Sequence, residues 1–136
     1  MSLSQFSFRS LTIQGLHSWF VDIWNHLKGE NYSNGDWTPT ITGMTGSPTV
    51  TAYYQRFGKI CNFAIILAGT HTMSDAEITL PKTATDYGVA TMHSLTDNST
   101  IGTAVIDSVA QRLKIKTYWV TDETIVIHGV YKVAGI

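Results

Sequence analysis

The chain has 136 residues, which suits one compact domain and is too short for two domains of ordinary size. Its nine lysine and arginine residues and ten acidic residues are scattered and give a formal net charge of -1, so no basic run could neutralise a row of nucleic-acid phosphates. Charged residues make up only 14% of the chain, against about 25% in typical domains, which predicts that another chain covers part of the surface.

The first predicted element is an N-terminal helix that follows a short extended arm near residues 5–13. From about Thr12, apolar residues recur at three- and four-residue steps, which places them on one side of a helix that ends near Gly29. The apolar stripe is broad and contains two tryptophans, so we expect the helix to be buried, to trimerise with copies of itself or to dock on a partner. The residues predicted to make this contact are Leu16, Trp19, Phe20, Ile23, Trp24 and Leu27.

The rest of the chain is predicted to be β. Residues 31–36 are rich in turn formers, with Asn34-Gly35 the strongest signal, and are predicted to link the helix to the β region. From Trp37 onward, short alternating or apolar runs separated by turn residues predict strands. These strands are expected near residues 37–42, 48–57, 59–69, 76–80, 87–94, 101–108, 111–119 and 124–133.

This pattern predicts a mainly β fold, an antiparallel, jelly-roll-like β-sandwich of about eight strands preceded by one helix. Residues 1–36 would form the arm and helix, and residues 37–136 the β-sandwich. Cys61 is the only cysteine and lies in an apolar strand pattern, so a buried free thiol is predicted. Neither a secretion signal nor a run of about 20 apolar residues occurs, so we expect a soluble protein with no membrane insertion.

Residues able to do chemistry are not grouped in a recognisable motif. The five histidines lack metal-site spacing, although three copies of one histidine around a trimer axis would leave a metal or anion as an alternative. Asp75 and Glu77 could share one face of a strand at the separation of a glycosidase pair, but a solvated polar edge is the favoured interpretation. We therefore expect no enzyme activity, no cofactor and no metal.

Several short motifs give the chain a resemblance to a known family. They are Trp37-Thr-Pro-Thr-Ile-Thr-Gly43, then Tyr53-Tyr-Gln-Arg-Phe-Gly-Lys-Ile60 leading into an apolar strand, then Ile78-Thr-Leu-Pro81 and Ile127-His-Gly-Val-Tyr131. Over residues 37–136, this series resembles the tail-fibre and receptor-binding proteins of tailed bacteriophages.

The resemblance implies a non-enzymatic homotrimer in the virion tail, made in the cytoplasm of the bacterial host, with β-sandwich tips at the end of a fibre. Its implied role is adhesion to a bacterial surface receptor, with a glycan favoured over a protein. The alternative is a structural virion component, such as a decoration, baseplate or adaptor protein, whose β domain binds viral protein rather than host sugar. In either role the N-terminal helix could contact other virion proteins. A free bacterial carbohydrate-binding module is a third hypothesis, disfavoured by the sparse charge and the tryptophan-rich helix.

Aromatic side chains are the candidate binding residues. Exposed tyrosine and tryptophan rings near loops are common platforms for sugars, because a flat apolar ring face packs against sugar C–H groups. Each ring could equally pack in the core or in a subunit interface. The predicted binding residues are Tyr32, Trp37, Tyr54, Tyr87, Tyr118 and Trp119.

Overall fold

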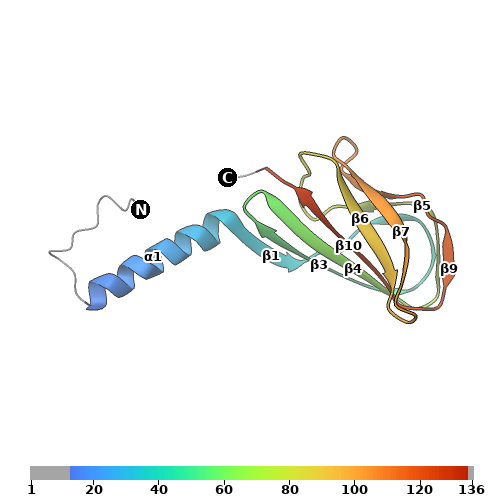
Figure 1. Cartoon of the computed structure of the whole chain (residues 1–136), viewed down its shortest axis with the longest axis horizontal. Helices are drawn as coiled ribbons and strands as arrows, with labels where there is room; N and C mark the ends of the chain where they lie inside the picture. Colours follow the sequence, from blue (N-terminus) through green and yellow to red (C-terminus); the bar gives the residue numbers. More distant parts are fainter. Residues whose placement is uncertain (1–12, 135–136) are drawn as a thin grey trace.

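The computed structural model describes the backbone of residues 13–134 and the side chains of residues 15–24 and 32–134. Helix α1 spans Ile13–Asn31, projects from one end of a β domain and runs directly into the first strand (Figure 1). It begins where the apolar period predicted and ends two residues beyond Gly29. The predicted N-terminal arm falls on residues 1–12, which lie outside the described part of the chain, apart from Ile13, where the helix begins.

The described strands form one ten-stranded antiparallel sheet. Their order is β1-β3-β4-β10-β6-β7-β8-β5-β2, with β9 paired to β5. The strands are β1 (Tyr32–Asp36), β2 (Ile41–Gly46), β3 (Thr49–Phe57), β4 (Ile60–Ala68), β5 (His71–Thr79), β6 (Gly88–Ser94), β7 (Ser99–Asp107), β8 (Arg112–Ile115), β9 (Trp119–Thr121) and β10 (Ile125–Lys132).

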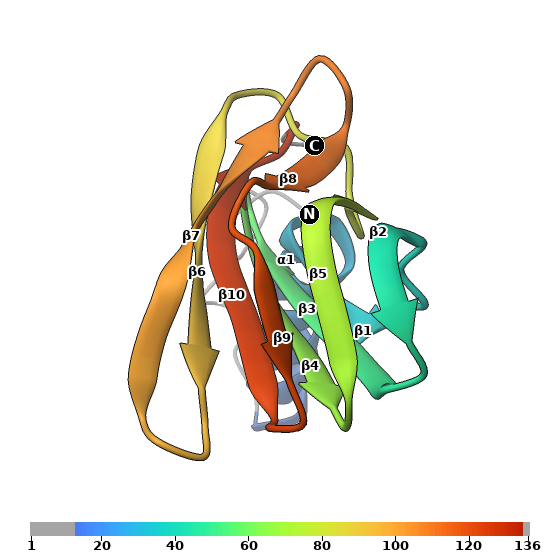
Figure 2. The ribbon, with the colours of Figure 1, turned by 90° about the vertical axis from the view of Figure 1, so that its right-hand side faces the viewer.

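The sheet curves around a single core, so that its two ends face each other (Figure 2). Strands from both ends of the order contribute to one apolar cluster, which includes Ile65 of β4, Ile127 of β10, Ile78 of β5 and Leu113 of β8. Burying side chains of this size stabilises the fold by about 1.5–3 kcal/mol each. The prediction of a mainly antiparallel, β-sandwich-like fold with one N-terminal helix is therefore confirmed.

Buried and solvent-facing side chains alternate along strand β10. In β10, Ile125, Ile127 and Tyr131 are buried, whereas His128 and Val130 between them face solvent. Position 129 also faces the core, but a Cβ there would lie 3.0 Å from carbons of Phe63, so only glycine fits without displacement. Glycine at this position lets β10 pack closely between β4 and β6.

Four boundaries differ from the prediction. The strand expected near residues 37–42 is β2 at Ile41–Gly46, and residues 37–40 lie in no strand. Residues 32–36 form strand β1, which pairs with β3, so the expected linker belongs to the sheet and Asn34-Gly35 makes no turn. Strand β5 begins at His71 rather than at 76, and Asp75 has a φ of 45° where the pairing with β2 shifts by a bulge. The run predicted at 111–119 divides into β8 and β9, which both pair with β5.

A buried histidine and tryptophan join β5 to the short strand β9. The indole N–H of Trp119 donates to Nε2 of His71 at 2.9 Å, so this nitrogen carries no proton. Nδ1 of His71 is then the donor to the carbonyl oxygen of Gly69, at 2.8 Å. Both polar contacts of this imidazole are therefore satisfied inside the protein.

Candidate functional site

Six adjacent strands present one broad surface to solvent. Strands β1, β3, β4, β10, β6 and β7 lie side by side, and alternate residues of each point away from the core. We call this surface the outer face. Because the strands are antiparallel and in defined register, its side chains fall into rows that cross the sheet.

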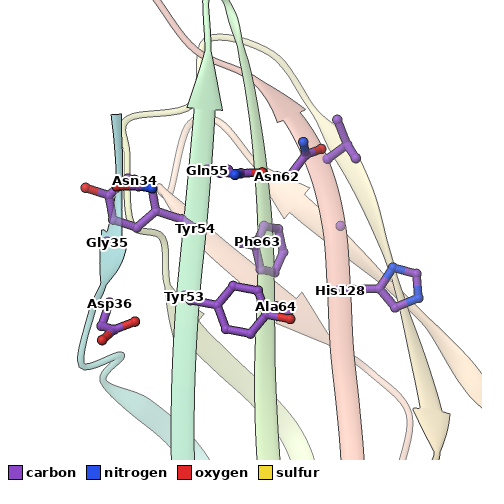
Figure 3. Close-up of a pocket in the computed structure, with 12 residues that line it drawn as sticks. Asn34, Gly35, Asp36, Tyr53, Tyr54, Gln55, Asn62, Phe63, Ala64 and His128 are labelled. Atoms are coloured by element: carbon purple, nitrogen blue, oxygen red, sulfur yellow. The ribbon is translucent and has the colours of Figure 1, made fainter. Parts of the chain in front are cut away.

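Two of these rows carry the polar groups of the candidate site. The amide row contains Asn34, Gln55 and Asn62, which are register partners on β1, β3 and β4. The tyrosine row contains Asp36, Tyr53, Ala64 and His128, which are register partners on β1, β3, β4 and β10. Figure 3 shows the two rows at successive levels of the same strands.

The two rows line an open trough on the outer face, with a volume of about 580 Å³. Its floor includes the small residue Ala64, which is buried, while the ring of Tyr53 beside it is 50% exposed. Backbone atoms of the alternate residues, such as Gly35 and Gly129, complete the lining. The trough therefore combines one accessible aromatic ring with polar side chains from four strands.

The hydroxyl of Tyr32 organises one end of the amide row. The side-chain N–H groups of Asn34 and Gln55 both donate to this oxygen, at 2.9 and 3.3 Å. Among the described residues, no hydrogen bond engages the amide oxygens of these two side chains. They are left as acceptors at the surface of the trough.

The other end of the trough is bounded by a histidine pair. The rings of His128 and His93 stack with centroids 5.2 Å apart and an angle of 8° between their planes. The hydroxyl of Thr100 contacts Nδ1 of His93 at 3.2 Å. No group of three potential metal-ligating side chains occurs in the described part of the chain.

Apolar side chains surround the polar rows on the outer face. Phe57 and Ile60 lie at the end nearest α1, and Val130, Val89 and Val105 continue the amide row across β10, β6 and β7. All five are exposed. This amount of exposed apolar surface is typical of a face that contacts other molecules.

The second candidate surface is helix α1. Phe20 is 57% exposed and Trp24 63% exposed, and Leu16 and Val21 are also exposed. The rings of Trp19 and Phe20 contact each other with centroids 5.2 Å apart, and Trp19 and Ile23 are half-buried. Of the residues predicted for this contact, the Leu27 side chain lies outside the described residues.

The predicted binding aromatics do not form one site. Tyr32 lies at the edge of the trough, whereas Tyr87 and Tyr118 are exposed elsewhere. Trp37 and Tyr54 pack against the core and against each other, with ring centroids 6.4 Å apart.

Trp119 requires a correction, because its ring is buried and its N–H is used by His71, so it offers no platform to a ligand. Among the aromatic residues of the trough, the one that sequence reasoning missed is Tyr53. Tyr53 and Tyr54 are adjacent in β3, so their side chains point to opposite faces of the sheet. The sequence alone does not show which of the two faces solvent.

The remaining reactive side chains have structural partners. Burial raises the pKa of the Cys61 thiol and of the Tyr131 hydroxyl, so neither is activated as a nucleophile. Asp75 pairs with Lys116 at 3.3 Å, and Glu77 lies 4.0 Å from Lys114. The two carboxylates therefore carry separate ion pairs at the surface.

Comparisons with known proteins add no relatives. No known protein family, no curated protein and no solved structure matches the chain. Within the described part of the chain, no helix has the length and apolarity that crossing a bilayer requires. The outer face of the sheet and the exposed side of helix α1 are therefore the features that bear on function.

Proposed function

We propose that the chain is a virion protein of the bacteriophage tail-fibre type, which adheres to a bacterial surface. Three copies associate through α1, and each β domain is presented at the end of the resulting helical stalk to a surface receptor, preferably a glycan. The proposal assigns no enzymatic step. The observation that carries it is the exposed apolar stripe of a helix that projects from its own domain.

The stripe has the spacing of a helix that associates with copies of itself. Leu16, Phe20, Ile23 and Leu27 follow one another at steps of four, three and four residues, which is the spacing of the core positions in a coiled coil. Most of the stability of helices in proteins comes from packing of their apolar face, and in α1 (19 residues) much of that face is exposed. Copies of α1 would supply that packing.

The number three comes from the resemblance to tail-fibre proteins, and the physics of adhesion agrees with it. Once one of the three tips on a stalk has bound, the other two are held near the same surface. Their effective concentration there is high, so they bind more readily. A weak site on each β domain is then sufficient for firm attachment to a repetitive cell surface. The low charge of the chain is also what a protein covered partly by its own copies would have.

Light scattering of the purified chain tests the association. The expected solution mass is about 45 kDa, three times the 15.0 kDa of one chain. Phe20→Glu should reduce this mass because it places a charge in the apolar stripe. Val21→Glu is the matched control, because Val21 is an exposed apolar residue on another side of the same helix. A strictly monomeric wild type at micromolar concentration would refute the trimer.

Adherence to bacteria tests the role. The wild type should bind cells of the host, and Phe20→Glu should bind them much more weakly because avidity is lost. The alternative role, that of a structural virion component, predicts no binding to bacterial cells. If the chain attaches to virions through α1 and to no bacterial cells, it is a structural virion component.

A further inference from the structure

The outer-face trough has the chemistry of a saccharide site. We propose that the trough lined by Asn34, Asp36, Tyr53, Gln55, Asn62 and His128 binds a neutral or amino-substituted bacterial polysaccharide. The inference rests on the proposed adhesive function and specifies the site and the ligand class. None of these six residues was predicted from the sequence as a binding residue.

The tyrosine row supplies a platform. The half-exposed ring of Tyr53 stands next to Ala64, whose small side chain leaves space above β4. A sugar ring can lie in that space with its C–H groups against the aromatic face, a contact that removes apolar surface of both from water. The imidazole of His128 closes the row on the far side, with its ring held by the stack on His93.

The amide row supplies matched hydrogen bonds. A sugar hydroxyl both donates and accepts, so a site for it needs donors and acceptors side by side. Asn34 and Gln55 offer amide oxygens next to the Tyr32 hydroxyl, and no side-chain hydrogen bond occupies Asn62 among the described residues. These groups are arranged along one line because their strands are in register.

The charge of the trough selects the ligand class. Among the residues that line it in the described part of the chain, Asp36 is the only carboxylate, and no lysine or arginine contributes. Phosphate-rich polymers bind where lysine and arginine side chains converge, so the trough is a poor match for them. A carboxylate beside an aromatic ring suits neutral sugars and sugars that carry an amino group.

The size and position of the trough favour a polysaccharide over a peptide. The tyrosine row crosses four strands, a width of about 14 Å at the usual strand spacing, and the two rows lie about 7 Å apart. That area accommodates a stretch of polymer rather than one ring. A peptide strand adds to a sheet through free backbone groups, but here β3, β4 and β10 are each paired on both sides.

The test measures binding of the full chain to purified bacterial polysaccharides. The panel contains neutral and amino-substituted polysaccharides, with phosphate-rich teichoic acid as the anionic comparison, and binding is measured by isothermal titration calorimetry. We expect binding of a neutral or amino-substituted member, and a loss of affinity of roughly tenfold or more in Tyr53→Thr and in Gln55→Thr. Threonine keeps the strand preference at both positions. Tyr118→Thr is the matched control, since this tyrosine is 65% exposed outside the trough and its loss should leave the affinity unchanged.

Four results would overturn the proposal. They are no binding of any polysaccharide by the wild type, a preference for teichoic acid, full affinity in Tyr53→Thr, or an equal loss in Tyr118→Thr. A fall in solution mass in Tyr53→Thr without loss of polysaccharide binding would instead make the outer face an interface between copies. Adherence to cells is measured on the same proteins, so trough variants that still adhere refute the site alone. A monomeric wild type that adheres to no bacteria refutes the adhesive function itself.

Discussion

Replacing Trp119 by phenylalanine should reveal how strongly the buried hydrogen bond to His71 stabilises the β domain. The substitution removes the indole N–H and leaves Nε2 of His71 without its donor in a site that is 1% exposed. An unsatisfied buried acceptor costs about 1–3 kcal/mol, and the space left by the smaller ring adds roughly 1 kcal/mol. We therefore expect the free energy of unfolding to fall by about 2–4 kcal/mol, a large part of the about 5–15 kcal/mol typical of a domain.

A double-mutant cycle separates the hydrogen bond from the loss of packing. His71→Leu alone leaves the indole N–H unpaired, whereas the double variant removes both polar groups and should lose less stability than the two single variants combined. Urea unfolding followed by far-ultraviolet circular dichroism measures each variant at one chain concentration, because self-association makes the apparent stability depend on concentration. Losses that add to within about 0.5 kcal/mol would refute the coupling.

Two further predictions concern packing and pH. Gly129→Ala should lower the free energy of unfolding by about 1–3 kcal/mol, because its Cβ would lie 3.0 Å from Phe63 and Ala90, and an unchanged urea midpoint would contradict this. A hydrogen bond from the Ala110 N–H and the contact with Lys114 hold the pKa of the Asp107 carboxyl below its usual range. The stabilisation is therefore present above the unfolded pKa of about 4 and is lost as the pH falls through the folded value, so Asp107→Asn should flatten the acid side of a urea-midpoint profile.

Local patterns in the sequence predicted the helix and the longer strands well. The three- and four-residue steps from Leu16 to Leu27 predicted α1. The apolar run in 59–69 predicted β4, and the pattern in 124–133 predicted β10. Strand β1 was missed because Asn34-Gly35 favours a turn when considered alone. Pairing with β3 along its whole length outweighs that local preference.

The candidate site could not be predicted in the same way. Tyr53 and His128 are far apart in the sequence and meet only through the register of β3, β4 and β10. A shift of one residue in β3 would turn Tyr53 toward the core and Tyr54 toward solvent. Composition marks both tyrosines as candidates, but it contains no information about register.

Strand β10 is the last of the described strands to be synthesised, yet it lies in the middle of the sheet. This strand lies between β4 and β6, so both of them present an open edge until residues 125–132 have left the ribosome. Helix α1 is made before the strands, and its backbone hydrogen bonds join residues that are close in the sequence. If α1 joins three chains as proposed, neighbouring nascent chains can meet through their stalks while their sheets are still incomplete. When β10 is added, it pairs with β4 and β6 and covers their open edges. These edges can then no longer pair between the three tethered domains.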